Sequence, residues 1–471
     1  MNVEQPSTNV SARGNSLWNN KGTKLTLRLL VLGIIGLIML IPLALVNQVI
    51  VERNQYRDEA SESITQTWGS SQVIAPILLT IPFISQERDS KGNLVDTMKY
   101  RHILPEELDL KAKVKTETKY KGIFKRVVYV TDLQISGFFP PLQPHNNGYL
   151  KKILWDDSFV AVGINDLKTI QGQPKIKFAD TTYNFEPKVN TSLVLSDGIS
   201  TKINLTDKYS QQNKFTIDLQ LRGTDSIKFI PVGRHSKISI QSSWLNPSFI
   251  GAFSPTSKEI NDKGFSASWD ISHLARGHVQ DWIGSTEWLK EEIDKPDYIK
   301  EYEGNNKSAA QSVATGVSFL VAVDFYRSSL RAVKYGILFI ALTFITYFMF
   351  EVISRIKIHP FQYLLVGIAV CIFYLLLLSL SEFIGFAWAY ILASLANVGL
   401  ITFYTKEITR KEKPNLYLYM LGVLLFLYSF LYVLLQLQDM SLLFGSVGLF
   451  IILGVIMYAT KNIDWYSPKE E

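Results

Sequence analysis

The chain has 471 residues, of which 47% are hydrophobic and 19% are charged, and its formal net charge is +6. This length allows two or three domains, and the modest charge, without a basic stripe of interleaved aromatic residues, argues against a nucleic-acid partner. The single cysteine, Cys371, excludes an internal disulfide and a cysteine-based metal site.

The first apolar run covers residues 29–46 and contains 18 residues without a charge. A helix needs about 20 apolar residues to cross a bilayer, and Pro42 is expected to kink it. A cleaved signal peptide is the alternative, but its apolar region spans only about 7–15 residues before a small-residue cleavage site. Here the run continues into residues 47–51 with no clear site. The pattern therefore predicts an uncleaved membrane anchor.

A long polar stretch follows, and its pattern changes from helical to strand-like. Charged residues 52–66 predict a helix that continues out of the membrane. Residues 110–120 alternate between apolar residues and lysines, a break follows at 121–122, and the pattern resumes at 127–131, which predicts a hairpin. Further strands are expected at 159–162, 215–221, 238–240, 265–269 and 317–323, with a helix or exposed loop at 282–302. Strands at this spacing favour an antiparallel, sandwich-like architecture.

Five more apolar runs fill the last third of the chain, at 335–350, 360–380, 383–405, 414–438 and 440–460. Each must be helical inside lipid, because lipid cannot satisfy an open backbone. The predicted fold class is therefore six transmembrane α-helices with a large β-rich extracytoplasmic domain inserted between helices 1 and 2. The expected parts are a polar leader (1–26), helix 1 (27–51), the β-rich domain (52–332), a five-helix bundle (333–460) and a tail (461–471).

The charges of the short loops predict the orientation, because cytoplasmic loops carry an excess of lysine and arginine. The segment before the first run is basic, and so are the loops after the second and fourth runs, with Arg355, Lys357, Lys406, Arg410, Lys411 and Lys413. The other turns hold no lysine or arginine, only Glu382 and Asp439. Both termini are therefore expected in the cytoplasm and the β-rich domain in the periplasm.

Ionisable residues inside a membrane are candidates for function, and here they lie only at the ends of the runs. The simplest interpretation is that Glu351, Glu382 and Asp439 are solvated at the interfaces. The functional alternative is that Ser381 and Glu382 line an outer vestibule. No motif for nucleotide binding, a zinc protease or a serine hydrolase is present, and no cofactor is expected.

Asn397 is the best polar candidate in the middle of a predicted span. It follows Gly385, Ala389 and Ala393 at four-residue spacing, a stripe of small residues typical of helix packing. A transporter more often has polar groups or broken helices at the membrane midplane. The stripe therefore favours packing over transport, and the candidate polar membrane positions are Ser381, Glu382 and Asn397.

Four strings, in order along residues 27–466, resemble the inner membrane protein CreD family. They are LIPLALVNQVIVERNQYR at 40–57, SWLNPSFIG at 243–251 with GFSASW at 264–269, KIHPFQYLLVG at 357–367, and NIDWY at 462–466. The resemblance implies a bacterial inner-membrane protein tied to envelope integrity, associated with a two-component response system and with tolerance to envelope-directed agents such as colicins. It implies no established enzymatic activity, and the longer leader at 1–26 departs from the family.

Three functions compete at this point. The leading hypothesis is a non-enzymatic envelope protein whose partners are the bilayer and an envelope component or protein bound by the periplasmic domain, in an unknown oligomeric state. The second is a transporter or export component, which would have a cavity lined by Ser381, Glu382, Asn397 or Gln436. The third is a membrane-tethered envelope hydrolase, which would place carboxylates beside His102, His235, His273 or His278.

Overall fold

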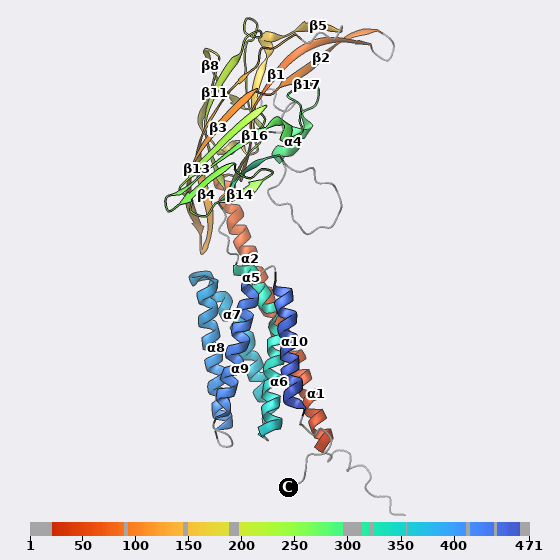
Figure 1. The fold of residues 1–471 in the computed structure, drawn as a ribbon, viewed down its shortest axis with the longest axis vertical. Helices are drawn as coiled ribbons and strands as arrows, with labels where there is room; N and C mark the ends of the chain where they lie inside the picture. The colour runs from red at the N-terminus through yellow and green to blue at the C-terminus, as the bar shows by residue number, and fades with distance from the viewer. Residues whose placement is uncertain are drawn as a thin grey trace, which may run out of the picture. The chain divides into compact units, whose positions relative to one another are not determined.

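The computed structural model describes residues 21–88, 93–144, 149–187, 197–294, 313–319, 325–354, 356–410, 415–437 and 440–461. It divides into two compact units (Figure 1). The helical unit comprises Met1–Tyr56 and Val323–Glu471, and the β unit comprises Arg57–Ala322. The predicted leader at 1–26 overlaps the first helix from Lys21, while residues 1–20 and the string at 462–466 lie outside the described residues.

The first span is one long helix with a single interruption. Helix α1 covers Lys21–Ile38 and α2 covers Leu40–Trp68. The backbone bonds Met39 N–H to Ile35 C=O (3.0 Å) and Leu43 N–H to Met39 C=O (3.3 Å) carry the helix across the junction. Pro42 has no N–H for the carbonyl four residues earlier, so the helical pattern breaks at this point. The structure confirms both the expected interruption and the helical extension over residues 52–66.

The rest of the helical unit contains α5 (Phe325–Lys334), α6 (Gly336–Ser354), α7 (Pro360–Ile384), α8 (Phe386–Thr409), α9 (Leu416–Gln436) and α10 (Ser441–Thr460). Among the described residues, five helices are long and apolar enough to span a membrane: Thr26–Trp68 and α6 to α9. In α10 the described apolar stretch is the shorter Leu443–Tyr458. Five spanning helices agree with the sequence, and the sixth stays a prediction.

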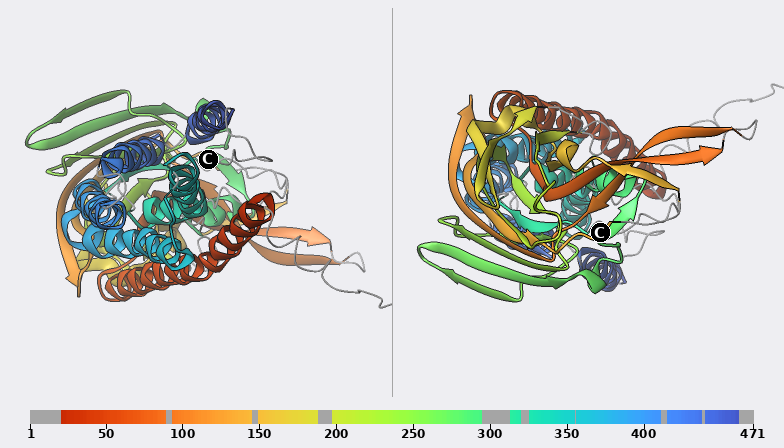
Figure 2. Two further views of the ribbon diagram at one scale, coloured as in Figure 1. Left: turned by 90° about the horizontal axis from the view of Figure 1, so that it is seen from below. Right: turned by 90° about the horizontal axis from the view of Figure 1, so that it is seen from above.

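Helix α5 is an element that the sequence pattern did not predict. It is amphipathic and buries Tyr326, Ser329, Ala332 and Val333 against the neighbouring helices α6, α7 and α9. It begins inside the range predicted for the β-rich domain, 52–332, but belongs to the helical unit. Helix α1 contacts α6 and α7, whereas α10 contacts α9 (Figure 2).

The β unit contains two sheets. One has ten strands, in the order β14-β18-β12-β1-β6-β10-β9, with β2 and β5 also paired to β1 and β17 paired to β2. Its strands are β1 (Gln72–Arg88), β2 (Leu94–Ile103), β5 (Leu150–Ile153), β6 (Phe159–Ile164), β9 (Glu186–Pro187), β10 (Gly198–Lys202), β12 (Ser226–Phe229), β14 (Ser248–Gly251), β17 (Asp281–Ile283) and β18 (Thr315–Ser318).

The other sheet has eight strands in the order β15-β16-β13-β3-β4-β11-β7-β8. Its strands are β3 (Glu107–Lys121), β4 (Phe124–Phe139), β7 (Ile170–Phe178), β8 (Thr181–Asn184), β11 (Asn213–Thr224), β13 (His235–Ser242), β15 (Ser257–Asn261) and β16 (Gly264–Ser272). The predicted hairpin is confirmed as β3–β4, in register from Glu107 opposite Phe138 to Lys121 opposite Phe124.

Strand pairing departs from the prediction in one respect, because the sheets are mixed. Most pairs are antiparallel, but β1 pairs with β12 and β3 pairs with β13 in parallel. Parallel neighbours need a long crossover, and local alternation of residues carries no information about such partners. The expected strand at 317–323 is observed as Thr315–Ser318, with 320–324 outside the described residues. The segment at 282–302 contains the end of β17 and α4 (Glu287–Asp294), and residues 295–302 lie outside the described residues.

Buried side chains from both sheets form one hydrophobic cluster. Along β3 the alternation holds as expected, with Leu108, Leu110, Ala112 and Val114 buried between exposed or half-buried residues. Trp269 of β16 is fully buried, and its indole N–H donates to the Phe253 carbonyl at 3.0 Å. Phe249 packs edge-on against this ring. The strings at 243–251 and 264–269 therefore contribute to the core.

Candidate functional site

Two carboxylates are buried in the helical unit. The side chain of Glu351, in the last turn of α6, is 7% exposed, and that of Glu382, near the end of α7, is 3% exposed. The expectation that both are solvated is wrong. A buried carboxylate stays charged only with a partner and hydrogen bonds, and each glutamate has an arginine and a tyrosine. Asp439 lies outside the described residues.

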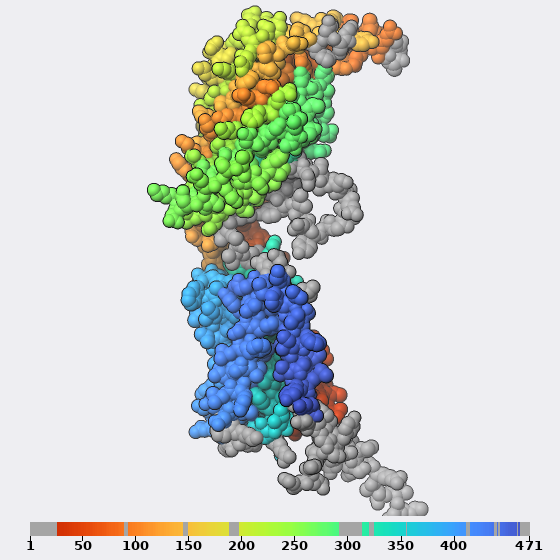
Figure 3. All heavy atoms as spheres, viewed as in Figure 1, coloured from red at the N-terminus to blue at the C-terminus, as the bar shows by residue number. Residues whose placement is uncertain are grey.

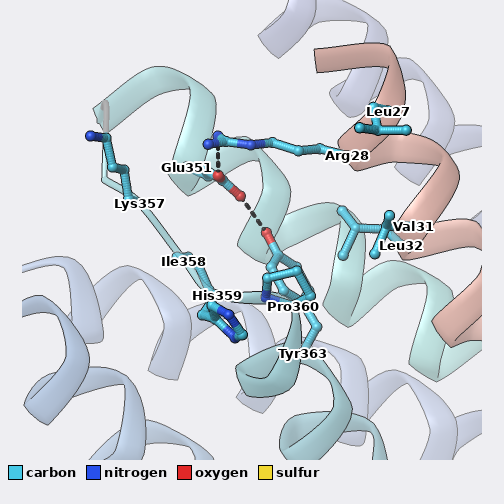
Figure 4. A pocket seen from close by; sticks show the side chains of 10 residues that line it. All are labelled: Leu27, Arg28, Val31, Leu32, Glu351, Lys357, Ile358, His359, Pro360 and Tyr363. Atoms are coloured by element: carbon cyan, nitrogen blue, oxygen red, sulfur yellow. Dashed lines mark hydrogen bonds and ion pairs between the residues drawn. The ribbon is translucent and has the colours of Figure 1, made fainter. Parts of the chain in front are cut away.

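The Glu351 cluster joins three helices. Arg28 of α1 donates from Nη1 to Oε1 of Glu351 at 2.5 Å. Tyr363, in the first turn of α7, donates its hydroxyl to Oε2 at 3.0 Å. Both carboxylate oxygens are therefore satisfied, and the cluster connects α1 to the junction between α6 and α7 (Figure 4).

The Glu382 cluster has the same composition. Arg53 of α2 donates from Nη2 to Oε2 of Glu382 at 3.1 Å. Tyr326 of α5 donates its hydroxyl to Oε1 at 3.0 Å. Both carboxylate oxygens of Glu382 therefore bind partners inside the bundle. This arrangement argues against Glu382 as a residue that lines an open vestibule.

The distance between the clusters along the first helix matches a bilayer. Arg28 and Arg53 are 25 residues apart, which corresponds to about 37 Å of helix at about 1.5 Å per residue. The hydrocarbon core of a bilayer is about 30 Å thick. One cluster is therefore expected near each edge of the apolar layer, and together they join the first helix to the other helices at both ends.

The other two predicted positions also bind internal partners. Asn397 is 5% exposed, and its amide donates to the Tyr428 hydroxyl at 2.6 Å. The Ser381 hydroxyl donates to the Leu378 carbonyl within its own helix at 2.8 Å. Ala389 and Ala393 are fully buried, which agrees with packing along α8. Gly385 instead forms the turn between α7 and α8 with a φ of 80°, a conformation that favours glycine.

Replacing Asn397 by leucine is expected to lower the free energy of unfolding of the helical unit by about 1 kcal/mol, because interhelical hydrogen bonds in membranes have about this strength. The Tyr428 hydroxyl loses its donor, while the volume of the side chain is roughly kept. Cys371 is buried and is the single cysteine, so thermal exposure of its thiol to a maleimide measures the effect. A variant of normal stability that loses function would contradict the packing role.

A pocket of about 460 Å³ opens beside the Glu351 cluster (Figure 4). Its lining comes from α1, the end of α6, the following segment and the start of α7: Leu27, Arg28, Val31, Leu32, Glu351, Lys357, Ile358, His359, Pro360 and Tyr363. Ser381, Glu382 and Asn397 are not in this lining.

The first turn of α7, which lines the pocket, is held by a helix cap. His359 caps the helix: its Nδ1 accepts from the Phe361 N–H at 3.2 Å, and its own N–H donates to Gln362 Oε1 at 2.9 Å. Pro360 occupies the first turn, where its missing N–H costs nothing. Helix α7 therefore begins at Pro360, where the apolar run predicted at 360–380 begins.

The histidines of the β unit give little support to a hydrolytic site. His235 lies 2.6 Å from the Asp270 carboxylate, but both side chains are more than half exposed to water. His102 is buried: its Nε2–H donates to the Gly284 carbonyl at 3.0 Å, and its Nδ1 accepts from the Thr80 hydroxyl at 3.0 Å. Burial lowers the pKa of His102 to about 4, so the ring is neutral.

His273 and His278 were the other two candidates for a hydrolytic site. The His278 ring stacks on Trp288 with 4.0 Å between ring centroids, and His273 lies in a short 3-10 turn. Within the part of the chain that the structure describes, no group of three or more His, Cys, Asp or Glu side chains could hold a metal ion.

Sequence reasoning missed the partners of the glutamates, which are Arg28, Arg53, Tyr326 and Tyr363. The spacing of charged residues along the sequence could have indicated these pairs. Arg28 and Arg53 flank the first apolar run at a separation close to one bilayer thickness, and Glu351 and Glu382 occupy the ends of later runs. Opposite charges at matching depths indicate pairing between helices, because an unpaired charge there is costly.

Known proteins resemble the chain over most of its length. A family model described as inner membrane protein CreD matches residues 24–466. Inner membrane protein CreD of Escherichia coli (strain K12) is 31% identical over 437 residues, which cover 92% of this chain and 91% of that protein. The range matched by the family model spans both units of the structure.

Proposed function

Because the chain belongs to the inner membrane protein CreD family, we propose that it is a non-enzymatic protein that supports envelope integrity under stress. Its helical unit serves as a multi-pass anchor in the inner membrane. Its β unit binds a component of the envelope. The support is twofold: the two buried glutamates of the helical unit are each paired with an arginine, and residues 94–99 of β2 have no second strand partner among the described residues.

The proposed topology has six spans, with α10 as the last and both termini in the cytoplasm. The β unit, with its two sheets stacked as a sandwich, lies in the periplasm. The excess of lysine and arginine supports this orientation, because Arg28, Lys357 and Lys406 flank the spans on the side assigned to the cytoplasm. The Glu351 cluster then lies at the cytoplasmic edge and the Glu382 cluster at the periplasmic edge.

The candidate binding surface is an arm formed by the far ends of β1 and β2. Residues Ser85–Arg88 of β1 pair with residues 94–97 of β2, and β5 pairs with β1 on its other side. The β2 strand of the arm exposes Leu94 (60%), Val95 (45%) and Met98 (48%). The neighbouring Tyr149, whose carbonyl accepts from the Gln86 N–H of β1, is also exposed (64%). Leu94 and Met98 lie on the same face of β2, because alternate residues of a strand point the same way. Exposed apolar side chains that share a face are typical of a protein-binding surface.

The outer edge of β2 adds a backbone template. Strand β17 pairs with β2 at Arg101–Ile103, and the Gly284 N–H donates to the Tyr100 carbonyl at 3.3 Å, so residues 94–99 have no second strand partner among the described residues. Exposed edges bind extended peptides by adding a strand, and neighbouring side chains give specificity. The arm therefore suits an extended segment of an envelope protein. Figure 3 shows these residues, in orange, at the surface of the β unit.

Site-specific photo-cross-linking in cells tests this proposal. A photoreactive amino acid at Met98 is expected to capture a discrete envelope protein. The matched control is Ile260 of β15, which is similarly exposed (51%) on an edge strand of the other sheet. A second variant, Leu94→Lys, changes the same face of β2 and should abolish capture from position 98 while tryptophan fluorescence of the β unit stays unchanged. Equal capture from both positions, or none from position 98, would reject the arm as the binding surface.

A further inference from the structure

We propose that the pocket beside the Glu351 cluster binds the phosphate headgroup of an anionic phospholipid. The pocket has the size of a small-molecule site, about 460 Å³, and ligand pockets commonly have about 300–1,000 Å³. It combines charged groups from Arg28, Lys357 and Glu351 with apolar walls.

The charges of the pocket complement one phosphodiester group. Two cations, Arg28 and Lys357, face one carboxylate, Glu351, which leaves a net charge of +1. Arg28 is paired through Nη1 but stays 49% exposed, and a guanidinium has five N–H donors, so several are left for a phosphate. Lys357 is exposed and has no ion-pair partner among the described residues. Basic pockets between membrane helices are suited to anionic headgroups.

His359 supplies a directed donor at the same place. Its Nδ1 accepts the Phe361 N–H, so the proton of the neutral ring lies on Nε2. The capping box at the start of α7 fixes this side chain. The ring can donate from Nε2 to a phosphate oxygen without losing its structural contact.

The apolar part of the pocket favours a lipid over free phosphate. Leu27, Val31 and Leu32 line the pocket, and the outer surface of α1 continues with exposed Leu30 (57%) and Ile34 (48%). Acyl chains can lie along this surface while the headgroup occupies the polar end. A zwitterionic lipid is less suitable, because its own ammonium group repels Lys357.

The test uses the full-length protein in bilayer nanodiscs. A phosphatidylglycerol that carries a diazirine in its acyl chain is expected to label peptides of α1 around residues 27–34. An excess of unlabelled phosphatidylglycerol should compete at least several times better than phosphatidylcholine. Lys357→Gln should weaken this competition about fivefold, the effect of one cation near a membrane surface. The exposed Lys406→Gln removes the same charge outside the pocket and should change nothing.

Three other outcomes of this labelling experiment would overturn the proposal of a lipid-headgroup site. Equal competition by phosphatidylcholine, or an equal effect of Lys406→Gln, means that labelling reports general contact with lipid or general charge attraction. Displacement of the label by millimolar inorganic phosphate or glycerol phosphate means that the site binds free phosphate. Tryptophan fluorescence and burial of Cys371 confirm that Lys357→Gln is folded.

Discussion

Replacing Arg53 by methionine is expected to lower the free energy of unfolding of the helical unit by about 3 kcal/mol. The variant leaves the Glu382 carboxylate, which is 3% exposed, with the Tyr326 hydroxyl but without its cation. Breaking a buried ion pair by removing one partner costs about 3–5 kcal/mol. The lower end applies here, because the Arg53 side chain is 43% exposed and its pairing is partly screened.

Neutralising Glu382 should lower the free energy of unfolding less than removing Arg53, because Arg53 is 43% exposed and Glu382 only 3%. Glu382→Gln keeps an oxygen that can accept from Tyr326 and Arg53, and the half-exposed Arg53 can turn its charge toward water. We expect a loss of about 1 kcal/mol, similar to one hydrogen bond. The double variant Arg53→Met, Glu382→Gln leaves no unpaired buried charge and should recover most of the stability lost in Arg53→Met.

Thermal exposure of the Cys371 thiol to a maleimide measures these changes without interference from the β unit, since the chain has one cysteine and it is buried in α7. The matched control is Arg410→Met. Arg410 is 73% exposed and lies 3.6 Å from Glu407 in a surface pair, which contributes about 0–1 kcal/mol. A larger loss in Glu382→Gln than in Arg53→Met would contradict the unequal burial of the pair.

The sequence was sufficient to predict features that depend on local pattern. The long first helix follows from an apolar run joined to a charged helical stretch, and its interruption follows from Pro42. The β3–β4 hairpin follows from alternation on both sides of Gly122. These elements are fixed by residues close in the chain, so the period of apolar residues alone identifies them.

Features that depend on distant contacts were not predictable in the same way. Glu351 and Glu382 bind arginines more than 300 residues away in the chain, and each occupies the end of an apolar run, where a solvated carboxylate has the same local pattern. The parallel partner of β1, strand β12, is likewise more than 100 residues distant. Contacts between residues far apart in the chain decide whether such a glutamate faces water or a partner, and which strands become neighbours.

The β unit is expected to lose about 3 kcal/mol of stability as the pH falls from 6.5 to 4, through His102 alone. This side chain is 1% exposed, and burial lowers its pKa from 6.5 to about 4. Between these values the unfolded chain binds a proton that the folded state rejects, so stability falls with pH. The contribution is complete above pH 6.5 and is lost toward pH 4, at about 1.4 kcal/mol per unit of pKa shift.

The variant His102→Gln isolates this contribution from the titration of carboxylates. Glutamine cannot titrate, and its amide can still donate to the Gly284 carbonyl, so the variant should be moderately less stable than the parent at pH 7 because it loses the ring contact with Trp282. Its deficit should shrink or reverse by pH 4. Six of the nine tryptophans lie among the described residues of the β unit, so fluorescence-monitored urea unfolding at each pH measures both proteins. Parallel pH profiles would show that the pKa of His102 is not lowered on folding, and would contradict a buried, neutral ring.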